Sequence, residues 1–168
     1  PRWYINGLVM KRRKINNRYL SERVPQTVEN TSIKADDFAK SIADFSNLYL
    51  KDALEVEIHG ESTGTVKAST SLTAYIIRMM LEIVSEDDYL HLRIDLGDEF
   101  TMSVEFETLP KLDDLARLVN TCRMAGFHAT RDDKAFSFSL KISSTNILKI
   151  YAIDAEEFIR DLQEVFFM

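Results

Sequence analysis

The sequence predicts an α/β two-layer sandwich, in which helices cover one face of a mixed, mostly antiparallel sheet. Three observations carry this prediction. Segments that alternate apolar and polar residues recur along the chain, which is typical of strands with one solvated face. Other segments place apolar residues every three or four positions, which is typical of amphipathic helices. The helices stand in line with hairpins instead of alternating strictly with single strands, which favours a sheet that is not fully parallel.

The first half of the main domain is predicted to form a helix, a strand, a short strand and a second helix. Asp36 is the expected N-cap of the first helix, and Ser69 or Ser71 is that of the second. Gly60 and Gly64 bound the turn between the two strands. These four elements are expected at residues 36–49, 54–59, 65–68 and 72–83.

The second half is predicted to form a hairpin, a helix, a second hairpin and a final helix. Gly97 and Asp98 turn the first hairpin, whose strands alternate apolar and polar residues throughout. Gly126 closes the third helix, and Asp154 with Glu157 forms a capping box for the last one. These elements are expected at residues 90–96, 102–106, 108–126, 127–130, 136–142 and 154–166, with a further strand at 147–153.

The 168 residues fit one domain with an N-terminal appendage. Residues 1–35 are expected to form a basic helix or arm and a polar linker, and residues 36–168 a single α/β sandwich domain with a C-terminal strand–helix extension. The single cysteine, Cys122, excludes an internal disulfide framework and is compatible with a reducing compartment. No apolar run approaches the ~20 residues of a membrane span, so a cytoplasmic protein is expected.

Few residues form a pattern that indicates catalysis or metal binding. His59, His91 and His128 fall in predicted strands and share no ligand spacing with one another or with Cys122, so they are expected to be exposed strand residues. Cys122 lies on the apolar stripe of its helix, which favours a core residue over a nucleophile. The P-loop and the G-x-S-x-G pattern are absent. We therefore expect no catalytic residue and no metal site.

Charge divides the chain into a basic arm and an acidic body. Residues 1–24 hold seven Lys or Arg and one Glu, a balance of +6, whereas the remaining 144 residues balance at −12. An acidic body is a poor general binder of nucleic acid, because phosphate contacts dominate that affinity. The expected partner-binding residues are therefore Lys11, Arg12, Arg13 and Lys14. A protein partner, an anionic membrane surface and the acidic body itself stay open as what the arm contacts, and the oligomeric state is unknown.

The stretch from Leu54 to Ile142 resembles the ATP-binding domain of histidine kinases and their relatives, the GHKL superfamily. Three features carry the resemblance: the strand pair that leads into the helix from Leu72, the hairpin from Leu90 to Glu107, and the closing strands that begin at Gly126. The order of elements extends it to residues 36–142. The resemblance implies a histidine-kinase ATPase-like sandwich, ATP and Mg²⁺ as ligands, and a role in bacterial signal transduction.

The chain departs from the family at the positions that would bind the nucleotide. The family presents an asparagine to Mg²⁺ from its second helix, and the matching position here is Glu86 in one register or Ile83 in another. A glutamate can ligate Mg²⁺ and an isoleucine cannot. Glu107 stands where the family has its adenine-reading aspartate, and neither glycine of DxGxG follows it. No two of the chain's five glycines form a GxG, so the backbone that would approach a phosphate is missing, and a lost nucleotide pocket is predicted.

Three functions remain open at this point. The leading hypothesis is a non-catalytic, cofactor-free module that acts through protein–protein interaction. The second is an active kinase or ATPase domain that binds ATP and Mg²⁺ through Glu86 and Glu107. The third is a ferredoxin-like βαββαβ domain that senses a small molecule or binds a partner. Residues 65–68 separate the two folds, because a true strand there favours the kinase-like sheet and a loop favours the ferredoxin-like one.

Overall fold

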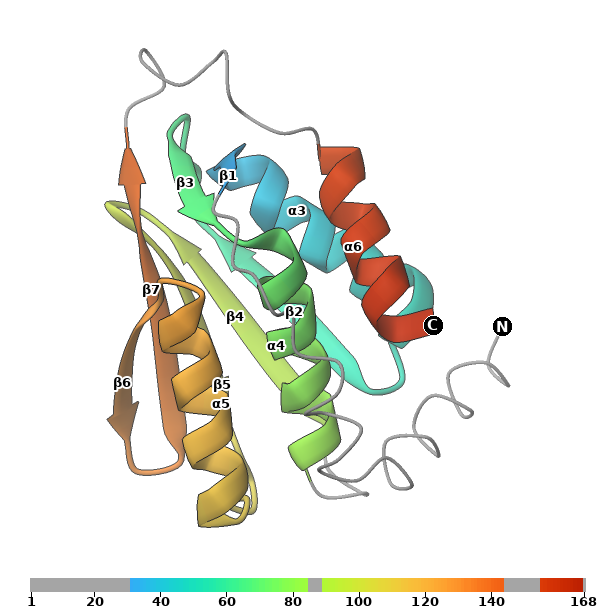
Figure 1. Cartoon of the computed structure of the whole chain (residues 1–168), viewed down its shortest axis with the longest axis vertical. Helices are drawn as coiled ribbons and strands as arrows, with labels where there is room; N and C mark the ends of the chain where they lie inside the picture. Colours follow the sequence, from blue (N-terminus) through green and yellow to red (C-terminus); the bar gives the residue numbers. More distant parts are fainter. Residues whose placement is uncertain (1–30, 85–88, 144–154, 168) are drawn as a thin grey trace.

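A computed structural model describes residues 31–84, 89–143 and 155–167. These residues form a seven-stranded sheet in the order β1-β3-β7-β5-β4-β2, with β6 paired to β7 beside this path (Figure 1). The strands are β1 (Thr31–Lys34), β2 (Leu54–His59), β3 (Thr65–Ala68), β4 (Leu90–Leu96), β5 (Glu99–Glu105), β6 (His128–Asp132) and β7 (Ala135–Ser143). The helices are α3 (Ala35–Phe45), which continues into a π-helical turn at Ser46–Leu50, α4 (Thr70–Ile83), α5 (Leu112–Met124) and α6 (Ala155–Phe167).

The sheet is mixed and mostly antiparallel, as the sequence predicts. Strand β5 pairs antiparallel with both β4 and β7, and the one parallel pair joins β2 to β4. Strand β7 pairs with β5 along one edge. Along its other edge it pairs with β6 in its first part and with β3 in its last part. The parallel pair brings together residues far apart in sequence, and Glu55 is the register partner of His91.

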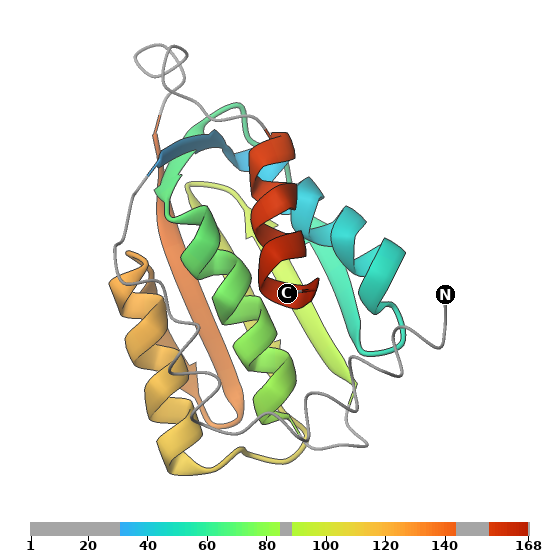
Figure 2. The same ribbon diagram turned by 45° about the vertical axis from the view of Figure 1, so that its right-hand side comes forward.

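The four helices lie on one face of the sheet (Figures 1 and 2). Alternation along the strands explains this arrangement, since successive side chains of a strand point to opposite faces. In β4, Leu90, Leu92 and Ile94 are buried beneath the helices, whereas His91 and Arg93 between them are exposed. The same alternation holds in β5 and β7. We call the solvated side the open face of the sheet.

Helix α6 packs on α3 and α4 (Figure 2). Its buried residues, Phe158, Leu162 and Phe166, recur at helical spacing. The ring of Phe158 lies 4.8 Å from that of Phe38, and the ring of Phe166 lies 5.4 Å from that of Phe45. This aromatic contact makes α6 part of the hydrophobic core.

The structure decides the questions that the sequence leaves open about the fold. Residues 65–68 form a true strand that pairs with β1 and β7, which favours the kinase-like sheet over the ferredoxin-like one. Ser69 is the cap of α4, because its hydroxyl accepts from the amide of Leu72 at 3.2 Å. The strand expected at residues 147–153 lies outside the described residues.

One prediction about the linker is wrong. Residues 31–34, expected to belong to a polar linker, form β1 and pair antiparallel with β3. Ile33 is the one large apolar residue in this segment, and its side chain is fully buried. A strand of four residues with one apolar side chain shows no alternation to recognise, and only its pairing with β3 reveals it.

Candidate functional site

Most of the residues expected to bind a partner or a nucleotide fall outside the part of the chain that the structure describes. Lys11, Arg12, Arg13 and Lys14, with Glu86, lie outside the described residues. Ile83 is the last residue of α4 and is half-buried. Glu107 is exposed just beyond the end of β5, on the border of the open face.

The polar side chains that α4 presents near its C-terminal end are Arg78 and Glu82. They form an ion pair of 2.7 Å, and each side chain is only 4% exposed. The Arg78 guanidinium also donates a hydrogen bond to the backbone carbonyl of Val165 in α6. Sequence reasoning missed this pair, although an arginine and a glutamate four residues apart on a helix are a visible signal. The pair ties α4 to α6.

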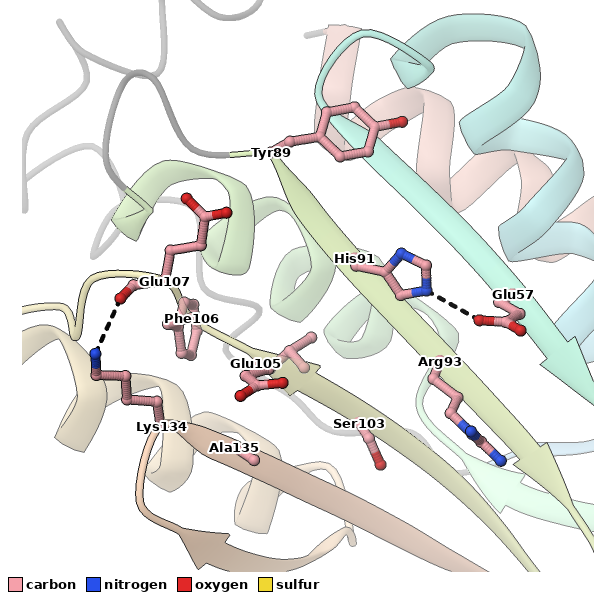
Figure 3. A pocket seen from close by; sticks show the side chains of 11 residues that line it. Glu57, Tyr89, His91, Arg93, Ser103, Glu105, Phe106, Glu107, Lys134 and Ala135 are labelled. Atoms are coloured by element: carbon pink, nitrogen blue, oxygen red, sulfur yellow. Dashed lines mark hydrogen bonds and ion pairs between the residues drawn. The ribbon is translucent and has the colours of Figure 1, made fainter.

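The open face of the sheet carries a groove of about 610 Å³ (Figure 3). It is lined by residues at the end of β5, at the start of β4 and at the start of β7, and by one residue of β2. We call it the open-face groove, and its lining residues are Glu57, Tyr89, His91, Arg93, Ser103, Val104, Glu105, Phe106, Glu107, Lys134 and Ala135.

Glu57 lies between two imidazoles in this groove. Its carboxylate contacts His59 Nε2 at 2.6 Å and His91 Nε2 at 3.0 Å. These contacts, that from His91 foremost, lower the pKa of the Glu57 carboxyl below its usual value. His91 also meets Glu55 through Nδ1 at 3.4 Å, so one imidazole bridges two carboxylates of the neighbouring strand.

Both cations of the groove have a partner within the protein. Arg93 donates from Nε to the two carboxylate oxygens of Asp95 at 3.1 and 3.0 Å, and these bonds raise the pKa of its guanidinium. Lys134 Nζ donates to the backbone carbonyl of Glu107 at 3.2 Å (Figure 3). The carboxylates of Glu105 and Glu107 form no ion pair with the residues that the structure describes.

A smaller hollow of about 460 Å³ lies between α5 and β6. Its lining is mostly apolar, with Leu115, Val119 and Ala129 among its residues, and it includes Arg123 and Arg131. The guanidinium of Arg131 stacks 5.1 Å from the centre of the Phe136 ring, a cation–π contact. The two hollows therefore differ in charge, because the lining of this one includes no carboxylate.

Cys122 is buried on α5, as the sequence predicts, and burial raises the pKa of its thiol. Within residues 31–84, 89–143 and 155–167, no three His, Cys, Asp or Glu side chains gather as a metal site would require. In the same ranges no helix has the length and apolar character that crossing a membrane requires.

No protein-family model matches the sequence, and no curated protein is similar to it. Solved structures of histidine kinases are similar in fold. The cytoplasmic segment of histidine kinase QseC is 11% identical, over 81% of this chain and 89% of that one, with a TM-score of 0.44. The catalytic domain of histidine kinase ThkA is 11% identical, over 70% and 99%, with a TM-score of 0.47. Acinetobacter baumannii histidine kinase AdeS is 15% identical, over 77% and 75%, with a TM-score of 0.44.

At TM-scores below 0.5, the resemblance to the histidine-kinase ATPase domain stays a prediction from the order of this chain's elements. Whether this chain binds a nucleotide has to be argued from its own residues.

Proposed function

We propose that this chain is a histidine-kinase-like module without nucleotide chemistry, which acts in bacterial signal transduction by binding another protein in the cytoplasm. The observation that carries the proposal is the closure of α4 by α6. In the family that the sequence resembles, the C-terminal part of this helix presents a Mg²⁺ ligand. Here the same part holds the buried Arg78–Glu82 pair, and α6 packs over it.

Because the two charged side chains of this buried pair already bind each other, they are poor ligands for a phosphate or a metal ion. Withdrawing Glu82 toward a metal would break this buried ion pair, which costs several kcal/mol. Admitting a nucleotide beside α4 would also disturb the contacts of α6, including the ring pairs made by Phe158 and Phe166. Both terms oppose nucleotide binding at this helix.

The end of the hairpin supports the same proposal. Phe106 is buried, and the backbone carbonyl of Glu107 accepts from Lys134. Only residues 106–111 connect β5 to α5, which leaves little chain for a phosphate-covering lid. The open face is polar and hollowed, and we propose it as a binding surface for a partner.

Calorimetric titration of the full chain with ATP and Mg²⁺ tests the proposal. We expect no heat of binding at millimolar ATP, for the wild type and for Glu86→Ala and Glu107→Gln alike. Micromolar binding that either substitution abolishes would overturn the proposal and favour the active ATP/Mg²⁺ alternative. Binding that neither substitution changes would overturn it too, and would place the nucleotide at residues other than these two.

A further inference from the structure

Among the residues that the structure describes, no counter-charge pairs with two carboxylates of the open-face groove. Glu105 and Glu107 are both exposed, and neither forms an ion pair within the described part of the chain. Glu105 is the last residue of β5 and Glu107 follows the strand end, and both side chains line the groove. A cationic ligand in the groove would meet both carboxylates.

The cations that line the groove do not neutralise these carboxylates. Arg93 is held by Asp95, and Lys134 donates to a backbone carbonyl. Together with Glu57, the lining therefore presents three carboxylates against two cations, one of which is paired with a fourth carboxylate, that of Asp95. The groove is acidic, and its charge selects for a basic ligand.

The groove also offers an aromatic surface for the stem of a long basic side chain. Tyr89 is 46% exposed at its rim, held by a 2.9 Å hydrogen bond from its hydroxyl to the carbonyl of Lys51. Lysine and arginine pack their methylene groups on such rings while the charged head stays in water or reaches a carboxylate. The groove thus matches an arginine- or lysine-rich segment better than a small inorganic cation.

The chain contains one segment of this chemistry, with Lys11, Arg12, Arg13 and Lys14 in succession and a balance of +6 over residues 1–24. We propose that these four residues dock in the open-face groove of their own chain. The inference goes beyond the proposed function, and it holds whatever the outcome of the nucleotide titration.

The segment is long enough to reach the groove. Sixteen residues lie between Lys14 and Thr31, where β1 begins, and an extended chain over these seventeen steps spans about 55 Å. From β1 to β4 the sheet has four strand spacings, about 20 Å, and a strand of seven residues is about 24 Å long. The reach therefore exceeds the distance to the groove, with residues to spare for passing round the β1 edge.

The docked state is expected to be weak but well populated. Surface ion pairs contribute little each, and salt screens them. Tethering compensates, because a flexible linker holds a segment at a local concentration in the millimolar range. A weak intramolecular contact of this kind is displaced by competitors: an acidic partner would take the arm, and a basic one would take the groove.

Paramagnetic relaxation enhancement in the full chain tests the contact directly. A nitroxide attached at Asn16→Cys, beside the basic run, should broaden the backbone amide resonances of Ser103, Glu105 and Glu107. The native Cys122 is buried, so the label is directed to the new thiol. At about 0.5 M salt, where the Debye length is about 4 Å, the broadening should be lost.

Charge-neutral variants provide the matched control. Glu105→Gln with Glu107→Gln should abolish the broadening, whereas Asp98→Asn with Glu99→Gln, at the opposite end of the same hairpin, should leave it unchanged. No broadening at low salt, or broadening centred on another surface, would overturn the proposal. Broadening of unlabelled chains by labelled ones, rising with concentration, would overturn it in favour of exchange between copies.

Discussion

Charged pairs differ in burial between the helix side of the sheet and its open face. On the helix side, Arg78 and Glu82 of α4 form an ion pair with each side chain 4% exposed, and Arg78 also bonds to α6. On the open face, Arg93 and Asp95 form a pair of similar length, 3.0 Å, with side chains 51% and 40% exposed. The first pair cannot lose a partner without leaving a charge in an apolar layer, whereas the second exchanges freely with water.

This difference in burial indicates which charged residues are available to bind a ligand. The buried pair holds α6 on α4 and is structural, so its loss should be felt in stability. The exposed charges of the open face contribute little to stability and are available to a ligand. Substitutions confined to one face at a time should therefore separate effects on stability from effects on binding.

The largest expected effect is on the buried pair. Arg78→Ala should lower the free energy of unfolding by about 3–5 kcal/mol, because it breaks an ion pair whose side chains are each only 4% exposed. Urea denaturation followed by circular dichroism measures the change. The double variant Arg78→Met with Glu82→Leu should recover most of the loss, since it removes both charges together.

The open-face counterpart is Arg93→Ala, which should leave the urea midpoint nearly unchanged. Equal losses for Arg78→Ala and Arg93→Ala would contradict the division of the two faces. A loss in the double variant as large as in the single one would show that packing, and not charge, accounts for the effect.

A smaller effect is expected in thiol reactivity, which should differ between the helix side of the sheet and its open face. Cys122 is buried on the helix side, and burial raises the pKa of its thiol, so it stays protonated and unreactive in the folded state. With Ellman's reagent at pH 8, its labelling should be limited by unfolding and should accelerate with urea. A cysteine placed at exposed Glu105 should react at once in native conditions. Rapid native labelling of Cys122 would contradict the burial of its helix face.

The smallest effect is expected at Glu57. Hydrogen bonds from His91 and His59 lower the pKa of this carboxyl in the folded state, so its contribution to stability is present above its unfolded pKa and is lost as pH falls through the lowered folded value. His91→Ala should raise the pKa of Glu57 toward its usual value, and more than His59→Ala does. A side-chain carboxyl NMR titration measures both. An unchanged pKa in both variants would show that these imidazoles do not hold the carboxylate.

The local elements could be predicted from the sequence because neighbouring residues specify them. The turn at Gly97 and the alternation on either side of it indicate the β4–β5 hairpin, and the cap at Ser69 marks the start of α4. The spacing of Arg78 and Glu82 is equally local, but their burial is not, since it depends on α6 arriving from more than eighty residues away. For this reason the pair went unrecognised as a feature of the site.

Local sequence patterns specify the order of elements and the buried sides of the strands. The separation of a basic arm from an acidic body and the absence of GxG are also properties of the sequence alone. Contacts between distant segments make β2 run parallel to β4, and this pairing places His91 beside Glu55 and Glu57. Such contacts also add β1 to the sheet. They likewise determine which polar residues are buried and which line the groove. Propensity, capping and turns depend on residues that are close in the sequence. Strand register and helix packing depend on contacts between distant segments, which no local pattern encodes.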